Sequence, residues 1–191
     1  MFSDPVVGSL FFGREEILET LKKRVDAHRD GYRQNLALIG GERLGKTSIL
    51  QQYLHTVHDR RVLRVYIDLT HQTLPTFLQH FCHTLLFQAL IGAQAGEDAV
   101  AAANLEALLQ RAQSVCPRTV AAVRSVLASI QSEDMERAYS ATLELPSCVY
   151  RETGRRCVVI LDEFHRLGDF PVKQAFQTFG KRLKEQKDTQ Y

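Results

Sequence analysis

The feature that most constrains this 191-residue sequence is a glycine-rich loop between a short apolar run and an amphipathic segment. Residues 40–47 read GGERLGKT and match the pattern GxxxxGK[ST] at every fixed position. The preceding run, residues 35–40 (NLALIG), predicts a buried strand, and residues 47–58 predict a helix from their apolar spacing. A strand, a glycine turn and a helix in this order predict a phosphate-binding loop.

Each fixed position of the loop has a chemical reason. Gly40 and Gly45 let the backbone curl so that successive N–H groups point at an anion, and the start of the helix adds its positive dipole end. Lys46 is expected to reach the β- and γ-phosphates, and the Thr47 hydroxyl to ligate Mg²⁺. The residues expected to contact the nucleotide here are Gly40, Gly41, Glu42, Arg43, Leu44, Gly45, Lys46, Thr47 and Ser48.

A second candidate site stands at the end of an apolar run, where residues 158–163 read VVILDE. In a parallel sheet the carboxyl ends of the strands open into the ligand crevice, so both acids are expected to face the phosphate loop. Asp162 is expected to hold Mg²⁺ through water, and Glu163 to orient and deprotonate an attacking water. Two acids in series favour Mg²⁺-dependent hydrolysis of a nucleoside triphosphate over simple nucleotide storage.

The order of apolar patterns along the chain predicts the fold class. Strands near residues 35–40, 62–69 and 156–163 alternate with helices, which indicates an α/β three-layer P-loop NTPase fold with a parallel sheet. We expect one nucleotide-binding domain over residues 1–191 that includes a helical segment over 74–146. The other expected helices cover residues 14–28, 74–90, parts of the alanine-rich stretch 89–128, 133–145 closed by Pro146, and a last helix with Val172, Phe176, Phe179 and Leu183 on one stripe.

Charge and composition exclude several classes of protein. The 24 Lys and Arg nearly balance the 22 Asp and Glu, so neither an acidic disordered chain nor a strongly basic nucleic-acid coat protein is indicated. The longest apolar stretch, residues 85–95, is about half the length that spans a bilayer. The four cysteines form no CxxC pair, which favours a reduced, cytoplasmic protein.

Three blocks of sequence occur in a characteristic order: FFGREE at residues 11–16, LIGGERLGKTSIL at 38–50 and VVILDEFHRL at 158–167. With these blocks the chain resembles the AAA+/STAND branch of the P-loop ATPases, which includes archaeal-type regulatory ATPases and origin-recognition initiators. The resemblance implies that the opening box lies against adenine, so Phe12, Gly13 and Arg14 are candidates for base contact. The alternative is that Phe11 and Phe12 have only a structural role and pack the first helix onto the core.

The resemblance also implies a sheet of strand order 5-1-4-3-2, in which a strand with a polar sensor residue separates the phosphate-loop strand from the acidic strand. The sequence supplies the first three strands and stops at Gln190 and Tyr191, where the fourth would begin. Without that middle strand, two inner sheet edges would be unpaired. We therefore expect an incomplete sheet, and a fragment or truncated gene product that folds poorly alone.

We interpret two other patterns as ordinary surface or helix residues without a functional site. His80 and His83 flank Cys82 at helical spacing, and His55 and His58 repeat it, but no further ligands with metal-site spacing are near; we interpret these residues as ordinary helix histidines. The basic clusters lie beside acidic or polar residues and are typical of solvated faces.

Three functions remain open from sequence. The first is ATP binding and Mg²⁺-dependent hydrolysis that acts as a regulatory or assembly switch, with an arginine finger supplied by a second subunit or protein partner. The second is an ATP-dependent DNA-binding or DNA-loading module of the initiator or transposition type. The third is a degenerate or truncated fragment without activity. No NKxD-type guanine-reading motif is present, and together with the opening box this favours ATP over GTP.

Overall fold

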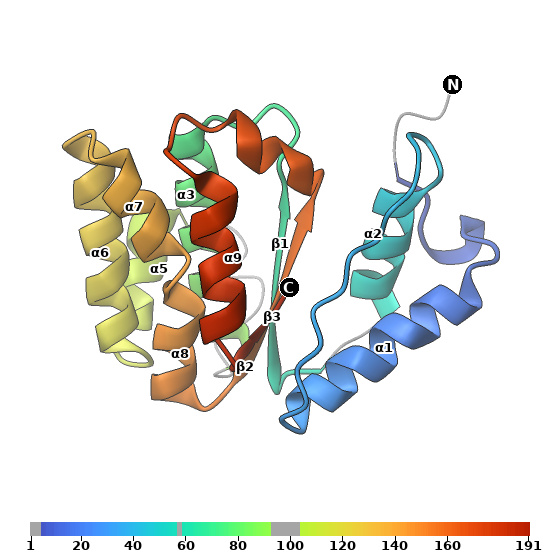
Figure 1. Cartoon of the computed structure of the whole chain (residues 1–191). Helices are drawn as coiled ribbons and strands as arrows, with labels where there is room; N and C mark the ends of the chain where they lie inside the picture. The colour runs from blue at the N-terminus through green and yellow to red at the C-terminus, as the bar shows by residue number, and fades with distance from the viewer. Residues whose placement is uncertain (1–4, 57–58, 93–103) are drawn as a thin grey trace.

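A three-stranded parallel sheet forms the centre of the computed structural model, which describes residues 5–56, 59–92 and 104–191 (Figure 1). The strands are β1 (Val62–Asp68), β2 (Arg156–Asp162) and β3 (Thr189–Gln190), and they lie in that order. β1 and β2 pair over their full length, with Asp68 opposite Asp162, whereas β3 pairs only with Cys157 and Val158. The expected α/β class with a parallel sheet is confirmed.

Helices cover both faces of this sheet. They are η1 (Gly8–Leu10), α1 (Glu15–Arg29), α2 (Lys46–Thr56), α3 (Leu74–Gly92), α5 (Leu105–Ala112), α6 (Pro117–Gln131), α7 (Met135–Thr142), α8 (Leu145–Thr153), η2 (Phe164–Asp169) and α9 (Ala175–Glu185). Figure 1 shows α1 and α2 on one side of the strands and α3 with α5 to α9 on the other. None of the helices in the described ranges combines the length and apolarity that crossing a membrane requires.

The face covered by α3 and α5 to α9 carries the main core. Alternate residues of β1, namely Leu63, Val65 and Ile67, point into it and are fully buried. Phe77 of α3 lies at its centre, with ring centroids 5.2 Å from Phe170 and 6.5 Å from Tyr139. This core therefore joins β1 and β2 to both the middle and the end of the chain.

The opposite face is covered more thinly. Its buried cluster consists of Val25 from α1, Tyr53 from α2, Val62 from β1 and Val158 from β2. Four half-buried side chains pack around these: Leu18, Leu21, Leu54 and Ile160. This small cluster holds the phosphate-loop helix, α2, against the sheet.

The predicted strand over residues 35–40 is wrong. This segment is extended and runs in the same direction as the strands, but it belongs to no strand and is mostly exposed, with Ile39 at 91% (Figure 1). Its attachment is at its start, where the Leu36 N–H donates to the Tyr191 carbonyl at 2.9 Å. The Tyr191 N–H in turn donates to the Asn35 side chain at 3.0 Å. An apolar run becomes a strand only where a neighbour supplies backbone partners, and among the described residues only Tyr191 does so for this segment.

The sheet order agrees with the order implied by the resemblance. β3 lies beside β2, and residues 35–36 come next to it, so the chain end separates the acidic strand from the phosphate-loop segment. Among the described residues, no strand continues beside residues 159–162 on that side. The inner edge of β2 is therefore open near the two acids.

Two predicted helix boundaries are also wrong. Pro146 does not close the helix expected over 133–145: α7 ends at Thr142, and Pro146 lies in the first turn of α8, where its missing N–H leaves no bond unmade. Val172 precedes α9, which begins at Ala175. The alanine-rich stretch contains α5 and α6, with Pro117 opening α6, whereas residues 93–103 lie outside the described residues.

Candidate functional site

The glycine-rich loop ends where α2 begins, at Lys46. The Ile49 N–H donates to the Gly45 carbonyl at 3.0 Å and closes the first helical turn. Gly45 has a φ of +80° and Arg43 a φ of +60°, so the backbone turns twice through the left-handed region immediately before the helix. These turns place the loop at the amino end of α2, where the helix dipole favours an anion.

Lys46 closes the loop on itself in this structure. Its Nζ donates to the Gly40 carbonyl at 3.1 Å and to the Gly41 carbonyl at 2.9 Å, and these bonds are exposed to solvent. The two carbonyls carry no charge to balance an ammonium group, so a phosphate oxygen is a stronger partner for it. The lysine is therefore positioned over the loop and can exchange its carbonyl contacts for a phosphate.

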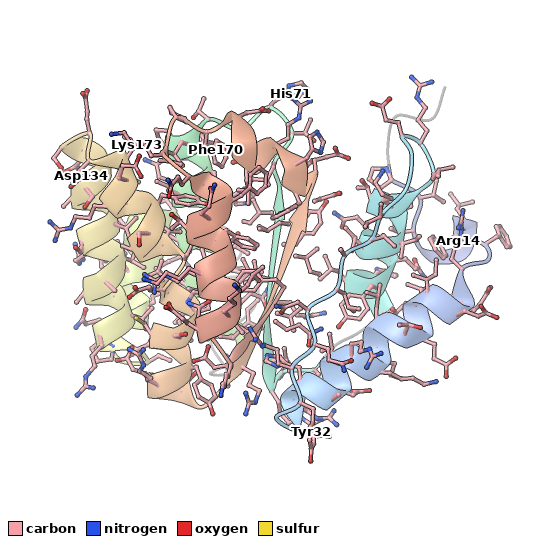
Figure 2. All side chains as sticks on the ribbon, viewed as in Figure 1. Arg14, Tyr32, His71, Asp134, Phe170 and Lys173 are labelled. Carbon is pink, nitrogen blue, oxygen red and sulfur yellow. The ribbon has the colours of Figure 1, made fainter. Side chains whose placement is uncertain are left out.

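The opening box and the loop line one pocket of about 350 Å³. Its lining residues are Val6, Leu10, Phe11, Phe12, Arg14, Arg43, Leu44, Gly45, Ser48 and Ile49. Phe12 remains 85% exposed, so its ring is available to a flat ligand. Figure 2 shows Arg14 beside the start of α1, on the far side of α2 from the strands. Of the three box residues proposed for base contact, Phe12 and Arg14 line this pocket, and Gly13 lies between them in the chain with a φ of +73°.

The N-terminal segment is tied to α2 by two side chains of that helix. The Val6 N–H donates to Ser48 Oγ at 3.0 Å, and the Gly8 N–H donates to Gln52 Oε1 at 2.7 Å. These bonds set the pocket wall against the helix. Ser48, expected at the nucleotide, thus has a backbone partner in the structure.

The acidic pair lies at the carboxyl end of β2. Asp162 is only 4% exposed, and each of its oxygens accepts a hydrogen bond: Oδ1 from the Glu163 N–H at 2.9 Å and Oδ2 from the Tyr66 hydroxyl at 3.0 Å. Burial and the nearby Asp162 raise the pKa of Tyr66 far above its usual range, so the phenol stays protonated and donates. The aspartate therefore has a fixed orientation.

Glu163 follows in a left-handed conformation, with a φ of 52°, which turns its side chain away from the strand direction. It is about one-third exposed and lies 3.4 Å from His165 Nδ1. The next residue, Phe164, packs on the Phe176 and Phe179 rings of α9, with centroids 5.5 and 5.3 Å apart. The glutamate is thus held between a buried aspartate and an anchored ring, with its carboxylate partly in solvent.

Loop and acidic pair open toward the same end of the molecule. In Figure 1 the loop before α2 and the carboxyl ends of β1 and β2 lie at the top of the view, and His71, in the turn after β1, is labelled there in Figure 2. Polar side chains lie between the two parts: Gln51 of α2 faces Tyr66 of β1, and the Tyr66 hydroxyl donates to Asp162. Sequence reasoning missed Gln51 and Tyr66, because nothing in either segment marks them apart from the alternation that turns Tyr66 toward α2.

The oxygens at this end fit the metal that the sequence predicts. Mg²⁺ prefers oxygen ligands and keeps several waters, and the candidates are one hydroxyl, Thr47 at the start of α2, and one buried carboxylate, Asp162. Within the part of the chain that the structure describes, no group of three or more His, Cys, Asp or Glu forms a separate metal site.

Comparison with known proteins agrees with this geometry. Neither the curated proteins nor the solved structures contain a significant match to the chain. The family model described as "AAA ATPase domain" matches residues 10–186, a range that holds the opening box, the loop, β1, β2 and the acidic pair. ATP binding and hydrolysis are the activity that this family name implies. The chain therefore belongs to the AAA ATPase domain family.

Proposed function

We propose that this chain binds ATP with Mg²⁺ and hydrolyses it, and that the nucleotide state acts as a regulatory or assembly switch. The observation that carries the proposal is the placement of a glycine-rich loop at the amino end of α2 and of Asp162 and Glu163 at the carboxyl end of β2, both at one end of the molecule. Family membership supports the nucleotide, and the two acids in series support hydrolysis.

The loop's own groups bind the phosphates in this proposal. Backbone N–H groups of residues 41–47 and the Lys46 ammonium hold the triphosphate, which takes over the lysine's contacts to the Gly40 and Gly41 carbonyls. The base occupies the neighbouring pocket of about 350 Å³, between Phe12, Arg14 and Leu44. A largely apolar pocket with two arginines, Arg14 and Arg43, beside a phosphate loop suits a flat base attached to a sugar and phosphates.

The proposal assigns ATP hydrolysis to Asp162 and Glu163 at the carboxyl end of β2. Thr47 and Asp162 would hold Mg²⁺, which neutralises the charge that develops on the phosphates. Glu163 orients a water and accepts its proton; its partly exposed carboxylate, beside His165, leaves room for that water. In this proposal an arginine from a second subunit or a partner protein stabilises the negative charge of the transition state.

The test separates binding from turnover with two single substitutions. Glu163→Gln keeps the size of the side chain but removes the base, so we expect turnover to fall by about 100-fold or more while ATP affinity stays the same. Lys46→Ala removes the phosphate contact and is expected to abolish binding itself. Fluorescent-nucleotide titration measures binding, and phosphate release measures turnover.

A matched control is Glu185→Gln, the same change at the last residue of α9, where the side chain pairs with Lys181 and Arg182 of its own helix. It is expected to leave both readouts unchanged. Equal loss of binding and turnover in Glu163→Gln would contradict the base assignment, and a wild-type chain that binds no ATP would contradict the proposal as a whole.

A further inference from the structure

A tyrosine on β1 contacts the carboxylate that the proposed function assigns to the metal. Tyr66 lies two residues before Asp68, which is opposite Asp162 in the strand register, so its side chain reaches along the sheet to the acid on the same face. Its hydroxyl donates to Asp162 Oδ2 at 3.0 Å. The contact joins two neighbouring strands, and its two residues are 96 positions apart in the sequence.

Two donors on two different oxygens fix the plane of a carboxylate. The Glu163 N–H holds Oδ1 and the Tyr66 hydroxyl holds Oδ2, so rotation about the Cβ–Cγ bond of Asp162 breaks both bonds. A carboxylate has about four lone-pair sites, so each oxygen keeps one for a further partner. The bonds therefore orient Asp162 without exhausting its capacity to accept.

Resting on the proposed function, we infer that Tyr66 is a positioning residue for the metal-binding carboxylate of Asp162. Groups that hydrogen-bond a ligating carboxylate set its direction, and their removal commonly lowers metal affinity or activity by about 10- to 100-fold. Tyr66 itself touches neither the metal nor the phosphates. It acts by keeping the aspartate aimed at the end of the sheet where the phosphate loop opens.

We expect removal of the hydroxyl to leave the fold intact. The Tyr66 ring is half-buried and lines an open hollow of about 430 Å³ between α2, β1 and α3, so Tyr66→Phe creates no closed cavity. The chain also offers a matched control in Tyr53, on α2. Tyr53 is 2% exposed, and among the described residues its hydroxyl has no hydrogen-bond partner. Tyr53→Phe is the same chemical change without a contact to Asp162.

The experiment titrates Mg²⁺ against a fixed concentration of fluorescent ATP, and repeats the nucleotide titration in EDTA. For Tyr66→Phe we expect the half-saturating Mg²⁺ concentration to rise about 10-fold or more, with metal-free nucleotide affinity and thermal midpoint unchanged. Tyr53→Phe is expected to match the wild type in the Mg²⁺ titration. In an Asp162→Asn background, Tyr66→Phe is expected to add nothing.

Each other outcome has a distinct meaning. An unchanged Mg²⁺ requirement in Tyr66→Phe overturns the positioning role while the proposed function stands. An equal loss of affinity in EDTA, or an equal effect in the Asp162→Asn background, shows a merely structural role and also overturns it. A wild-type chain that binds nucleotide neither with Mg²⁺ nor without it overturns the proposed function together with this inference.

Discussion

The two faces of the sheet differ in how firmly they hold the chain. On one face, β1 and β2 pack into a continuous core with α3, α5 to α8 and α9; on the other, α1 and α2 share a much smaller apolar cluster with the strands, in which four of the described residues are buried. The phosphate loop, the opening box and the exposed segment 35–40 all belong to the second face or its edge. Ligand-binding parts of proteins are commonly drawn from such weakly packed regions, because these can rearrange without unfolding the whole.

Asp162 and Glu163 stand at the border between the two faces. Asp162 is tied to Tyr66, on the phosphate-loop face, whereas the residue after Glu163 is anchored to α9, on the helical face. The proposed catalytic groups are therefore held by both faces, and the proposed phosphate-binding groups by one. A substitution that loosens either face should disturb the position of Asp162 and Glu163. Only a substitution on the thinly covered face should disturb the phosphate loop directly.

The largest expected effect comes from acid, and it acts on the thin face. His28 of α1 is fully buried and its Nε2 lies 3.2 Å from the Cys157 carbonyl; burial, together with the charges of Arg156 and Arg33, lowers the pKa of His28 to about 4. The unfolded chain binds this proton near pH 6.5, so between pH 6.5 and 4 it binds more protons than the folded chain. Stability is full above pH 6.5 and falls on acidification, by up to about 3 kcal/mol at pH 4.

Urea unfolding at pH 7.5 and pH 4.5 measures this loss. His28→Gln, which cannot be protonated, is expected to show a smaller difference between the two pH values than the wild type. The same pH dependence in both proteins would show that α1 is not held by a neutral histidine.

One substitution on the two sides of a single strand compares the faces directly. Val65 points into the helical core and Val62 into the thin cluster, and both are almost fully buried. We expect Val65→Ala to destabilise by about 2 kcal/mol, because its densely packed surroundings cannot collapse into the space, and Val62→Ala by about 1 kcal/mol. Chemical denaturation of both variants measures the difference. Equal losses would mean that the two faces are equally well packed.

The smallest effect concerns the contact between η2 and α9 near the acids. A Cβ at Gly168 would lie 2.9 Å from the Phe176 ring, which is 42% exposed and can swing aside. Gly168→Ala is therefore expected to destabilise by only about 1 kcal/mol. Gly180→Ala lies inside α9, where no described atom beyond the neighbouring backbone of its own helix is within 4 Å of the new Cβ; it is the control and should stabilise by about 0.5–1 kcal/mol. Thermal unfolding measures both variants, and we expect their melting temperatures to shift in opposite directions. Shifts in the same direction would contradict the close contact between residue 168 and the Phe176 ring.

Several parts of this architecture follow from local sequence patterns. The loop GGERLGKT, the β-branched runs of β1 and β2 and the amphipathic stripes of α1, α2 and α3 give their elements at nearly the expected residues. These patterns succeed because they describe local geometry and burial on one face, which neighbouring residues determine. The position of acids at the carboxyl end of a strand follows in the same way.

Other parts were decided by tertiary structure alone. The run NLALIG has the composition of a strand, yet it stays outside the sheet because backbone hydrogen bonds come from a neighbour and not from its own residues. Pro146 fits a helix end and a helix start equally well, and the packing of α8 selected the start. The bond from Tyr66 to Asp162 joins residues 96 positions apart in the sequence and depends on the register between β1 and β2. Sequence alone determined which elements could form and which chemistry they carry, whereas the pairing of distant segments decided which of them joined the sheet and which side chains orient the acids.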